Sequence, residues 1–251
     1  MVTVASLWRY PIKSHGRETM ASTPLITGKT IPWDRHWAVT HGDTKFDHDN
    51  PTWIGCRNFM IGTATPSLAG MSATFDQQSE TITLRHVDLG KVTFRPSDPA
   101  DVNRFITWVS PICPPDKRQP TGIVSAPDRG MTDTPTATVS IMNLASHDAV
   151  ALQAENPLQM ERWRGNIWVD GADAWAEWDW IGKTVQIGDA KLRVIDPVQR
   201  CKHTEANTTT GTRDIDTLSI LRDGWDHQNF GVYAEVIQDG TVHLGDTLKV
   251  E

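Results

Sequence analysis

One cysteine stands among basic residues in a polar part of the chain. Cys201 is flanked by Arg200 and Lys202 and follows an apolar, strand-like segment at residues 192–195. Positive neighbours favour the thiolate, the form of cysteine that binds metals or attacks electrophiles. Free cysteine is also among the most often buried residue types, so an inert buried thiol is the alternative. The position of Cys201 after a strand-like segment indicates a loop at the end of a sheet, where functional sites are common. The residues alone leave both interpretations open.

Other patterns narrow the chemistry. The chain has nine histidines but no HxH or HExxH spacing, which argues against a zinc site. His203 follows the cysteine and could transfer protons, although a lone loop histidine is more often solvated. The chain also has no GxGxxG segment that would indicate a dinucleotide site. We therefore expect that the electrons for any redox reaction would come from another molecule.

Composition bounds the class of protein. The chain has 251 residues, 38 % of them hydrophobic, and a formal net charge of −7, which indicates a globular protein. An acidic surface repels phosphate backbones, so we expect no nucleic-acid partner. We also expect no membrane association, because no window approaches the length of an apolar span and the N-terminus lacks a signal-peptide pattern. Three scattered cysteines predict no disulfide framework, which is typical of a cytoplasmic protein.

The elements that must position the cysteine are mostly strands. The N-terminal half shows short strand patterns at 2–10, 37–40, 81–85 and 91–95, then a helix from 97–99 to 109. Residues 111–135 are rich in Pro, Gly and Asp and predict a long connection. The C-terminal half predicts strands at 138–142, 192–195 and 232–237, and a helix from Ser146 to about Glu155. The fold class predicted is β-rich α+β, with two β-structured lobes and a few short helices.

Tryptophan is abundant near the centre of the C-terminal half. The chain has 11 tryptophans, and a group of them lies between Trp163 and Trp180. Such side chains can surround a substrate, but they more often pack in cores and at rims. We expect packing to be their main role.

The segment around Cys201 also carries a family resemblance. It has the pattern Arg-Cys-x-x-Thr-x-x-Asn-x-x-x-Gly, formed by Arg200, Cys201, Thr204, Asn207 and Gly211. This pattern resembles the signature loop of the MOSC domain, which is named after molybdenum cofactor sulfurases and occurs in the mitochondrial amidoxime-reducing component. Segments at 162–167, 181–189, 230–233 and 240–246 resemble further parts of that domain, in the same order.

The N-terminal half resembles the companion β-barrel domain of that family. Residues 7–14 read LWRYPIKS, and residues 34–37 read DRHW. The resemblance implies a MOSC-type β-barrel with a smaller N-terminal β-barrel-like domain. The implied boundaries are 1–110 for the N-terminal domain, 111–135 for a connecting loop and 136–251 for the MOSC domain.

The resemblance also implies a cofactor. Members of the family bind molybdenum cofactor, a pterin dithiolene with a terminal phosphate, and one protein thiolate coordinates the metal. Cys201 is implied as this metal ligand and as the catalytic residue. The cofactor contacts that the resemblance implies are Lys13, Ser14, Arg35, Thr138, Ser140, Asn143, Arg164, Asn166 and Arg200.

Three functions follow from this resemblance as expectations. The first is an oxidoreductase that reduces small N-hydroxylated or related N-oxygenated substrates with electrons from a separate electron-transfer protein. The chain shows neither the cysteine cluster nor the pyridoxal-phosphate domain of larger relatives, so it is expected neither to relay electrons itself nor to mobilise sulfur. The second is a non-redox carrier of the cofactor, or of sulfur as a persulfide on Cys201. The third is a barrel protein with a vestigial site.

Overall fold

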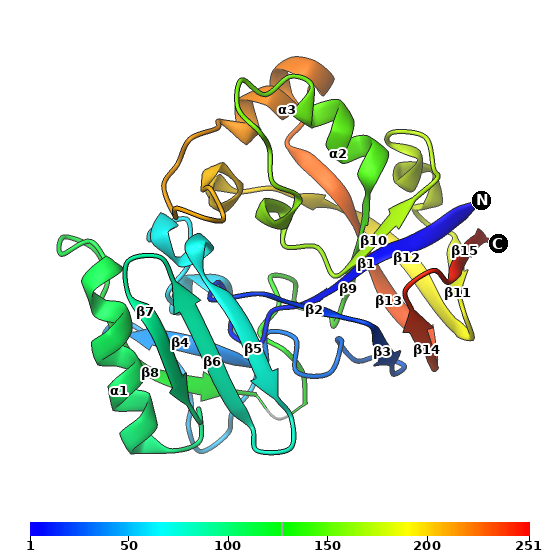
Figure 1. Ribbon diagram of the computed structural model, residues 1–251. Coiled ribbons are helices and arrows are strands. Elements are labelled where there is room, and N and C mark those ends of the chain that lie inside the picture. The colour runs from blue at the N-terminus through cyan, green and yellow to red at the C-terminus, as the bar shows by residue number, and fades with distance from the viewer. Residues whose placement is uncertain (127) are drawn as a thin grey trace.

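The computed structural model describes residues 1–126 and 128–251, and Figure 1 shows two lobes of strands. Pro127, which falls in the predicted connection, lies outside the described residues. The described chain has three short α-helices: α1 (Pro99–Val109), α2 (Leu144–Ala151) and α3 (Thr217–Trp225). The predicted β-rich fold with a few short helices is confirmed.

The larger lobe is a closed barrel. Its strands follow the order β10-β9-β13-β12-β11-β15-β1, and β1 pairs back with β10 to close a ring of seven. Their bounds are β1 Val2–Arg9, β9 Val139–Asn143, β10 Ile167–Asp170, β11 Thr184–Ile187, β12 Ala190–Gln199, β13 Asn229–Gln238 and β15 Thr247–Val250. Alternate residues such as Leu192 and Val194 point inward and are fully buried, so side chains fill the interior.

Two smaller pairings extend the barrel lobe. Strand β2 (Glu18–Met20) continues the sheet beyond β1, and β3 (Ser22–Leu25) pairs with β14 (Gly240–His243). Strand β1 also pairs with β15, so the two chain ends lie side by side, as Figure 1 shows. The first residues of the chain are therefore part of the same barrel as the last.

The N-terminal lobe has a core of its own. Strand β4 (Trp37–His41) pairs with β8 (Pro120–Ser125), and β5 (Ser72–Asp76), β6 (Thr81–His86) and β7 (Gly90–Phe94) form an antiparallel sheet. Helix α1 covers this lobe, and its Phe105 stacks on Phe94 with 4.7 Å between ring centroids. The helix begins as its sequence predicts, because the Asp98 side chain accepts hydrogen bonds from the first backbone amides.

The segment 111–135 differs from the predicted loop. It contains β8, which is hydrogen-bonded to β4 along its length. The proline that opens β8 is tolerated because the first residue of a strand does not need to donate to a neighbour. Strand β1 lies within the segment 1–110 predicted as the N-terminal domain, but it pairs with β10 and β15 of the C-terminal barrel.

Two element boundaries also differ from expectation. Helix α2 is capped by Asn143 rather than by Ser146, and it ends at Ala151, short of Glu155. Strand β12 does not stop at Asp196-Pro197 but continues to Gln199, with register shifts on both sides of Pro197. Bulges of this kind absorb a proline within a sheet and bend the strand.

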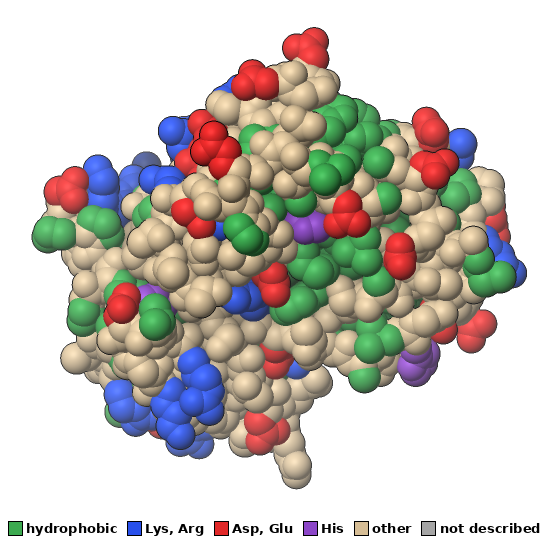
Figure 2. All heavy atoms as spheres, turned by 45° about the horizontal axis from the view of Figure 1, so that its top comes forward, with side chains coloured by type: hydrophobic (Ala, Val, Ile, Leu, Met, Phe, Trp, Pro, Cys, Tyr) green, Lys and Arg blue, Asp and Glu red, His purple; other side chains and the backbone are tan. Residues whose placement is uncertain are grey.

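Six 3₁₀ helices connect these elements in the described chain: η1 Cys56–Asn58, η2 Pro66–Gly70, η3 Ser110–Ile112, η4 Met160–Trp163, η5 Ala176–Trp180 and η6 Lys202–Glu205. No α-helix of the described residues has the length and apolar content needed to cross a membrane. Figure 2 shows one face of the molecule, where acidic side chains are scattered and the densest group of basic side chains lies at the lower left.

Candidate functional site: a thiol in a cavity lined by cations

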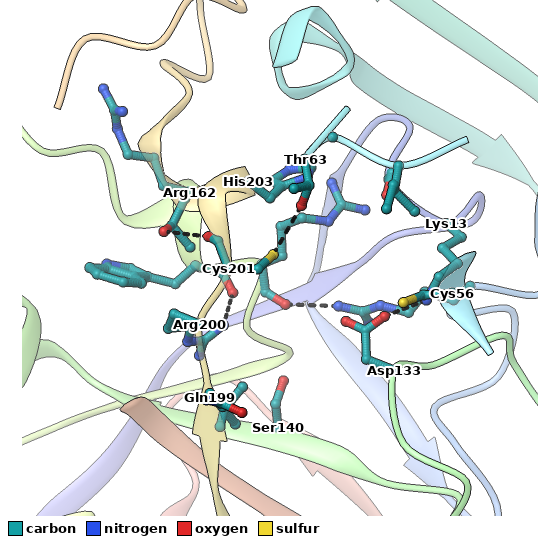
Figure 3. Close-up of a pocket in the computed structure, with 18 of the residues that line it drawn as sticks. Lys13, Cys56, Thr63, Asp133, Ser140, Arg162, Gln199, Arg200, Cys201 and His203 are labelled. Atoms are coloured by element: carbon teal, nitrogen blue, oxygen red, sulfur yellow. Dashed lines mark hydrogen bonds and ion pairs between the residues drawn. The ribbon is translucent and has the colours of Figure 1, made fainter. Parts of the chain in front are cut away.

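A cavity of about 280 Å³ lies where the two lobes meet. It brings together seven of the residues implied by the resemblance: Lys13, Ser14, Arg35, Ser140, Arg164, Arg200 and Cys201. Figure 3 labels four of them, Lys13, Ser140, Arg200 and Cys201, which come from segments that are far apart in the sequence. The fold therefore builds one site from residues between positions 13 and 201.

Cys201 lies between the end of β12 and the start of η6. Its carbonyl oxygen accepts hydrogen bonds from the amide and the hydroxyl of Thr204, at 3.1 and 3.0 Å, which fixes the backbone beside the thiol. Its side chain is exposed to the cavity, whereas Cys113 is buried and burial raises the pKa of that thiol to about 11. The structure excludes the alternative of a buried, inert Cys201.

Two arginines of the cavity wall pack against one buried tyrosine ring. The guanidinium carbons of Arg35 and Arg164 lie 4.6 and 4.2 Å from the centroid of the Tyr10 ring. The Tyr10 hydroxyl donates to the carbonyl oxygen of Gly165 at 2.9 Å, and burial raises the pKa of Tyr10 to about 12. The ring therefore stays neutral, and its π-face stabilises two neighbouring cations.

Arg164 holds a donor without a partner. Its Nη1 donates to the carbonyl oxygen of Gly16 at 3.3 Å, but its Nη2 is buried and has no hydrogen-bond partner in the described structure. Burial and the nearby Arg35 lower the pKa of Arg164 to about 9, so the side chain remains charged at neutral pH. A buried, charged donor without a partner is costly, and a ligand oxygen would satisfy it.

Three of the cavity residues have a left-handed backbone. The φ angles of Ser14, Arg35 and Arg164 are 63°, 51° and 50°. A residue with a Cβ pays roughly 1–2 kcal/mol for this conformation, and such residues cluster at binding and catalytic sites. Backbone hydrogen bonds hold two of them in place, from the Arg35 amide to Tyr10 and from the Arg164 amide to Glu161.

Lys13 is neutralised by a carboxylate that the sequence interpretation missed. Its Nζ donates to Asp133 and, at 2.8 Å, to the carbonyl oxygen of Met131. The Asp133 side chain is 62 % exposed toward the cavity. The surrounding protein displaces water from the carboxylate and so raises its pKa, but Lys13 and Arg35 outweigh this and lower the pKa to about 2. Asp133 lies in the segment interpreted as a connection, and no spacing pattern marked it.

Arg200 lies in the wall, but its donors are already used. Its Nη1 donates to the carbonyl oxygen of Trp163 at 2.6 Å, and both Nε and Nη2 donate to the carbonyl oxygen of Phe230. Burial lowers the pKa of Arg200 to about 10, so the side chain still carries its charge at neutral pH. Its main role in the structure is to join η4 to the start of β13.

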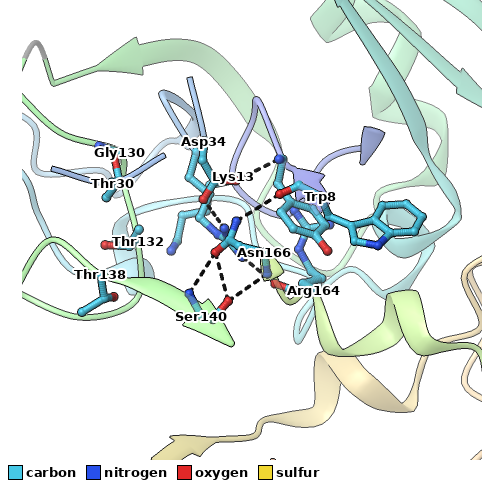
Figure 4. Close-up of polar contacts among 12 residues, drawn as sticks. Trp8, Lys13, Thr30, Asp34, Gly130, Thr132, Thr138, Ser140, Arg164 and Asn166 are labelled. Atoms are coloured by element: carbon cyan, nitrogen blue, oxygen red, sulfur yellow. Dashed lines mark hydrogen bonds and ion pairs between the residues drawn. The ribbon is translucent and has the colours of Figure 1, made fainter. Parts of the chain in front are cut away.

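Two predicted contact residues form hydrogen bonds within the protein, outside the cavity lining. The Asn166 Oδ1 accepts hydrogen bonds from the Ser140 amide and hydroxyl at 3.2 and 2.9 Å, and its Nδ2 donates to the carbonyl oxygen of Trp8, as Figure 4 shows. Thr138 shares a hydrogen bond with the Thr134 hydroxyl instead. Neither Asn166 nor Thr138 lines the cavity.

Asn143 does not reach the cavity either. Its Nδ2 donates to the carbonyl oxygen of Asp173 and to Glu177, at 2.7 and 2.9 Å, and its Oδ1 caps the first turn of α2. All its polar atoms are engaged, and the side chain is fully buried. The expected contact with a cofactor is therefore not available to this residue, whose polarity serves the helix cap.

His203 is buried rather than solvated. It lines the cavity, and a Cβ added to Gly62 would come within 1.9 Å of its ring. Burial, followed by the nearby charge of Arg164, lowers the pKa of His203 to about 3, so the imidazole is neutral at physiological pH. Only a glycine at position 62 allows the two lobes to approach this closely.

The central tryptophans mainly pack, as expected. Trp163 and Trp168 are almost fully buried, and Trp163 stacks on Phe230 with 4.1 Å between centroids. Trp163 also forms part of the cavity wall, beside Tyr233. The sequence did not single out Tyr233, although it belongs to the segment 230–233 that resembles the family.

The chain matches the models of two known domain families. Residues 128–249 match the model of the MOSC domain, and residues 1–108 match that of the MOSC N-terminal beta barrel domain. The chain is a MOSC-domain protein. MOSC domains are associated with molybdenum cofactor binding.

Two solved structures resemble this MOSC-domain protein at low identity. YiiM from Geobacillus stearothermophilus is 19 % identical over 45 % of this chain and 53 % of its own, with a TM-score of 0.36, so the match spans about half of YiiM. The YUAD protein from Bacillus subtilis is 13 % identical over 100 % of this chain and 96 % of its own, with a TM-score of 0.47. No curated protein matches the chain.

The cavity of this MOSC-domain protein fits the chemistry of molybdenum cofactor. The buried Nη2 of Arg164 offers an unused donor to a phosphate or pterin oxygen, and Arg35, which forms an ion pair with Asp34, also lines the cavity. The exposed thiol of Cys201 offers a soft sulfur ligand to a metal. The described chain has no cluster of three or more His, Cys, Asp or Glu side chains suited to a metal, so a metal here would depend on this thiol and on the cofactor's own sulfurs.

Proposed function

We propose that this protein binds molybdenum cofactor, with Cys201 as the protein ligand of the metal, and reduces small N-hydroxylated or related N-oxygenated compounds. The observation that carries the proposal is one exposed thiol in a cavity whose wall also holds a buried arginine donor without a hydrogen-bond partner among the described residues. The thiol can bind the metal at one end of such a ligand, and the arginine donor can bind the phosphate at the other end.

The chain's own residues bind and orient. Arg164 and Arg35 face the anionic part of the ligand, while Cys201 holds the metal end. Asp133, kept ionised by Lys13, can accept hydrogen bonds from amino groups of a ligand. When bound, the cofactor supplies two-electron oxygen-atom transfer, chemistry that protein side chains lack.

Electrons must then come from a separate protein. Removal of oxygen from an N-hydroxyl group consumes electrons and protons, and the sequence shows no second cysteine cluster or dinucleotide fingerprint to supply them. We therefore propose an external electron-transfer partner in a reducing compartment such as the cytoplasm, which suits three free cysteines.

The first test is metal content. Protein produced in a host that makes the cofactor is compared with Cys201→Ser, Cys56→Ser and Cys113→Ser by elemental analysis for molybdenum. We expect Cys201→Ser to lose the metal and the two control variants to keep it. Equal molybdenum content in Cys201→Ser and the parent protein contradicts the ligand assignment.

The second test is turnover of the loaded protein. We expect reduction of an amidoxime or a hydroxylaminopurine with a chemically reduced viologen and none with NADH alone. Turnover with NADH alone contradicts the proposed external donor. Loaded protein that stays inactive with reduced viologen on several N-hydroxylated compounds contradicts the proposed substrate class.

A carrier role is the alternative. It is favoured by the presence of a second thiol, Cys56, in the wall of the same cavity as the exposed Cys201. A carrier would hand over the cofactor, or a persulfide sulfur on Cys201, without turnover. Mass spectrometry of freshly purified protein tests for the sulfur-carrier form, because a persulfide adds one sulfur atom to the peptide that contains Cys201.

A further inference from the structure

The thiol of Cys201 has a hydrogen-bond partner in the other lobe. The Thr63 hydroxyl lies 3.4 Å from the Cys201 Sγ and is oriented to donate to it. Figure 3 shows the two side chains meeting across the cavity from different lobes. The sequence interpretation did not single out Thr63, which belongs to none of the segments that resemble the family.

Several contacts hold Thr63 in this position. Its carbonyl oxygen accepts a hydrogen bond from Arg213 at 2.7 Å, and Arg213 belongs to the loop that follows Cys201. The carbonyl oxygen of Ile61 accepts hydrogen bonds from the amides of Ala64 and Thr65, both at 3.0 Å, which closes a turn around Thr63. The hydroxyl is thus presented by a fixed turn rather than by a free side chain.

We propose that Thr63 is a positioning residue that orients the Cys201 sulfur toward the bound metal and tunes that metal through a hydrogen bond to the sulfur. This inference rests on the proposed function, because it requires Cys201 to be the metal ligand. A donor that points at a ligating sulfur draws electron density away from the metal. The reduced metal is stabilised as a result, and its reduction potential rises.

Three variants separate the hydroxyl from the shape of the side chain. Thr63→Val replaces the hydroxyl with a methyl group of similar size, and Thr63→Ser keeps the hydroxyl. Thr65→Val is the matched control, because Thr65 lies in the same turn and its buried hydroxyl has no hydrogen-bond partner. All three are made in full-length protein loaded in a cofactor-competent host.

The readouts are molybdenum content, the electron paramagnetic resonance spectrum of the half-reduced metal and its midpoint potential. We expect Thr63→Val to shift the ratio of reduced to oxidised metal about threefold toward the oxidised form, or about 28 mV at about 59 mV per tenfold change. The spectrum should change with it. Thr63→Ser and Thr65→Val should match the parent protein. Loss of metal from Thr63→Val alone also supports the proposal, because valine keeps the size of threonine without its hydroxyl, whereas the smaller serine keeps the hydroxyl.

The opposite results overturn it. A fully loaded Thr63→Val with an unchanged spectrum and potential shows that the hydrogen bond does not affect the metal. Equal loss of metal from Thr63→Val and Thr63→Ser shows that packing, not the hydroxyl, is what matters. Both results leave the proposed function intact. A parent protein that binds no molybdenum, or whose metal does not require Cys201, overturns the proposed function and this inference together.

Discussion

Arg164 combines several unusual properties at a single residue. It has a left-handed backbone, its guanidinium packs on Tyr10 beside a second cation, and one of its buried nitrogens has no hydrogen-bond partner in the described structure. The left-handed backbone and the unpartnered nitrogen both cost free energy in the absence of a ligand. Residues that reduce stability in this way are typical of binding sites, where the ligand restores the loss.

This leads to a prediction about affinity. Arg164→Gln removes the charge while keeping a polar side chain, and each charge-assisted hydrogen bond lost costs about 1.5–3 kcal/mol. We expect cofactor affinity to fall about ten- to hundredfold, with no loss of thermal stability. The exposed Arg193 gives the control variant Arg193→Gln. Full occupancy of Arg164→Gln after extensive dialysis would show that the unpaired donor does not contact the cofactor.

The second prediction at this scale concerns pH. His15 is 1 % exposed, its Nδ1 lies 2.7 Å from the carbonyl oxygen of Lys13, and burial lowers its pKa from 6.5 to about 4. Below pH 6.5 the unfolded chain takes up a proton that the folded chain refuses, so this residue makes stability fall as the pH drops toward 4.

The measurement is urea unfolding at neutral pH and at about pH 5. Between pH 6.5 and about 5 the titration of His15 costs about 2 kcal/mol, at about 1.36 kcal/mol per unit. His15→Asn can keep the bond to the Lys13 carbonyl and does not titrate, so it should lose about that much less stability than the parent. The same loss in both proteins would show that His15 is already accessible to protons.

At the scale of elements, side-chain caps and bulges decide where segments begin and end. Asn143 starts α2 three residues before the position expected from Ser146. Its amide also joins the helix start to the buried Glu177, whose pKa is raised by burial. A polar residue in a strand-to-helix turn thus has two structural uses, and neither requires a ligand.

The corresponding prediction separates structure from binding. Asn143→Ala removes the cap and one donor to Glu177, so we expect a loss of about 2 kcal/mol in the free energy of unfolding. Cofactor occupancy of the folded protein should not change. The exposed Asn103 on α1 supplies the control Asn103→Ala. If Asn143→Ala keeps its stability but loses cofactor, the residue belongs to the site after all.

At the scale of the whole molecule, the site exists only because the two lobes touch. Gly62 in the N-terminal lobe lies directly against the ring of His203 in the barrel lobe, and Arg17 donates to the carbonyl oxygen of Thr208 across the same seam. The backbone of Gly62 does not need a positive φ, so only the lack of a side chain matters there.

This seam gives the fourth prediction. In Gly62→Ala the new methyl group would lie 1.9 Å from the His203 ring, which is buried and cannot move away freely. We expect a loss of about 1–3 kcal/mol in the free energy of unfolding, together with lower molybdenum content. Gly42→Ala is the control, because nothing lies within 4 Å of its added Cβ. Equal unfolding midpoints for the two variants would show that the seam opens without cost.

The sequence by itself determined the class of fold and the central residue of the site. Strand patterns, a helix cap at Asp98 and an ordered series of motifs were local features, readable over a few neighbouring positions. The basic neighbours of Cys201 and the signature loop marked the thiol, and all four of the implied basic residues line the cavity with it.

Only the tertiary structure decided which polar residues face the cavity and what they can do there. Asparagine is common in binding sites, but the side chains of Asn143 and Asn166 form their hydrogen bonds with other residues of the protein, such as Asp173 and Ser140. Asp133 and Thr63 showed no pattern, because they reach the site through contacts between distant segments. Burial and neighbouring charges, which lower the pKa values of His203 and Arg164, depend on everything that surrounds a group in space. Such surroundings arise only when strands from both ends of the chain close one barrel and the other lobe packs against it.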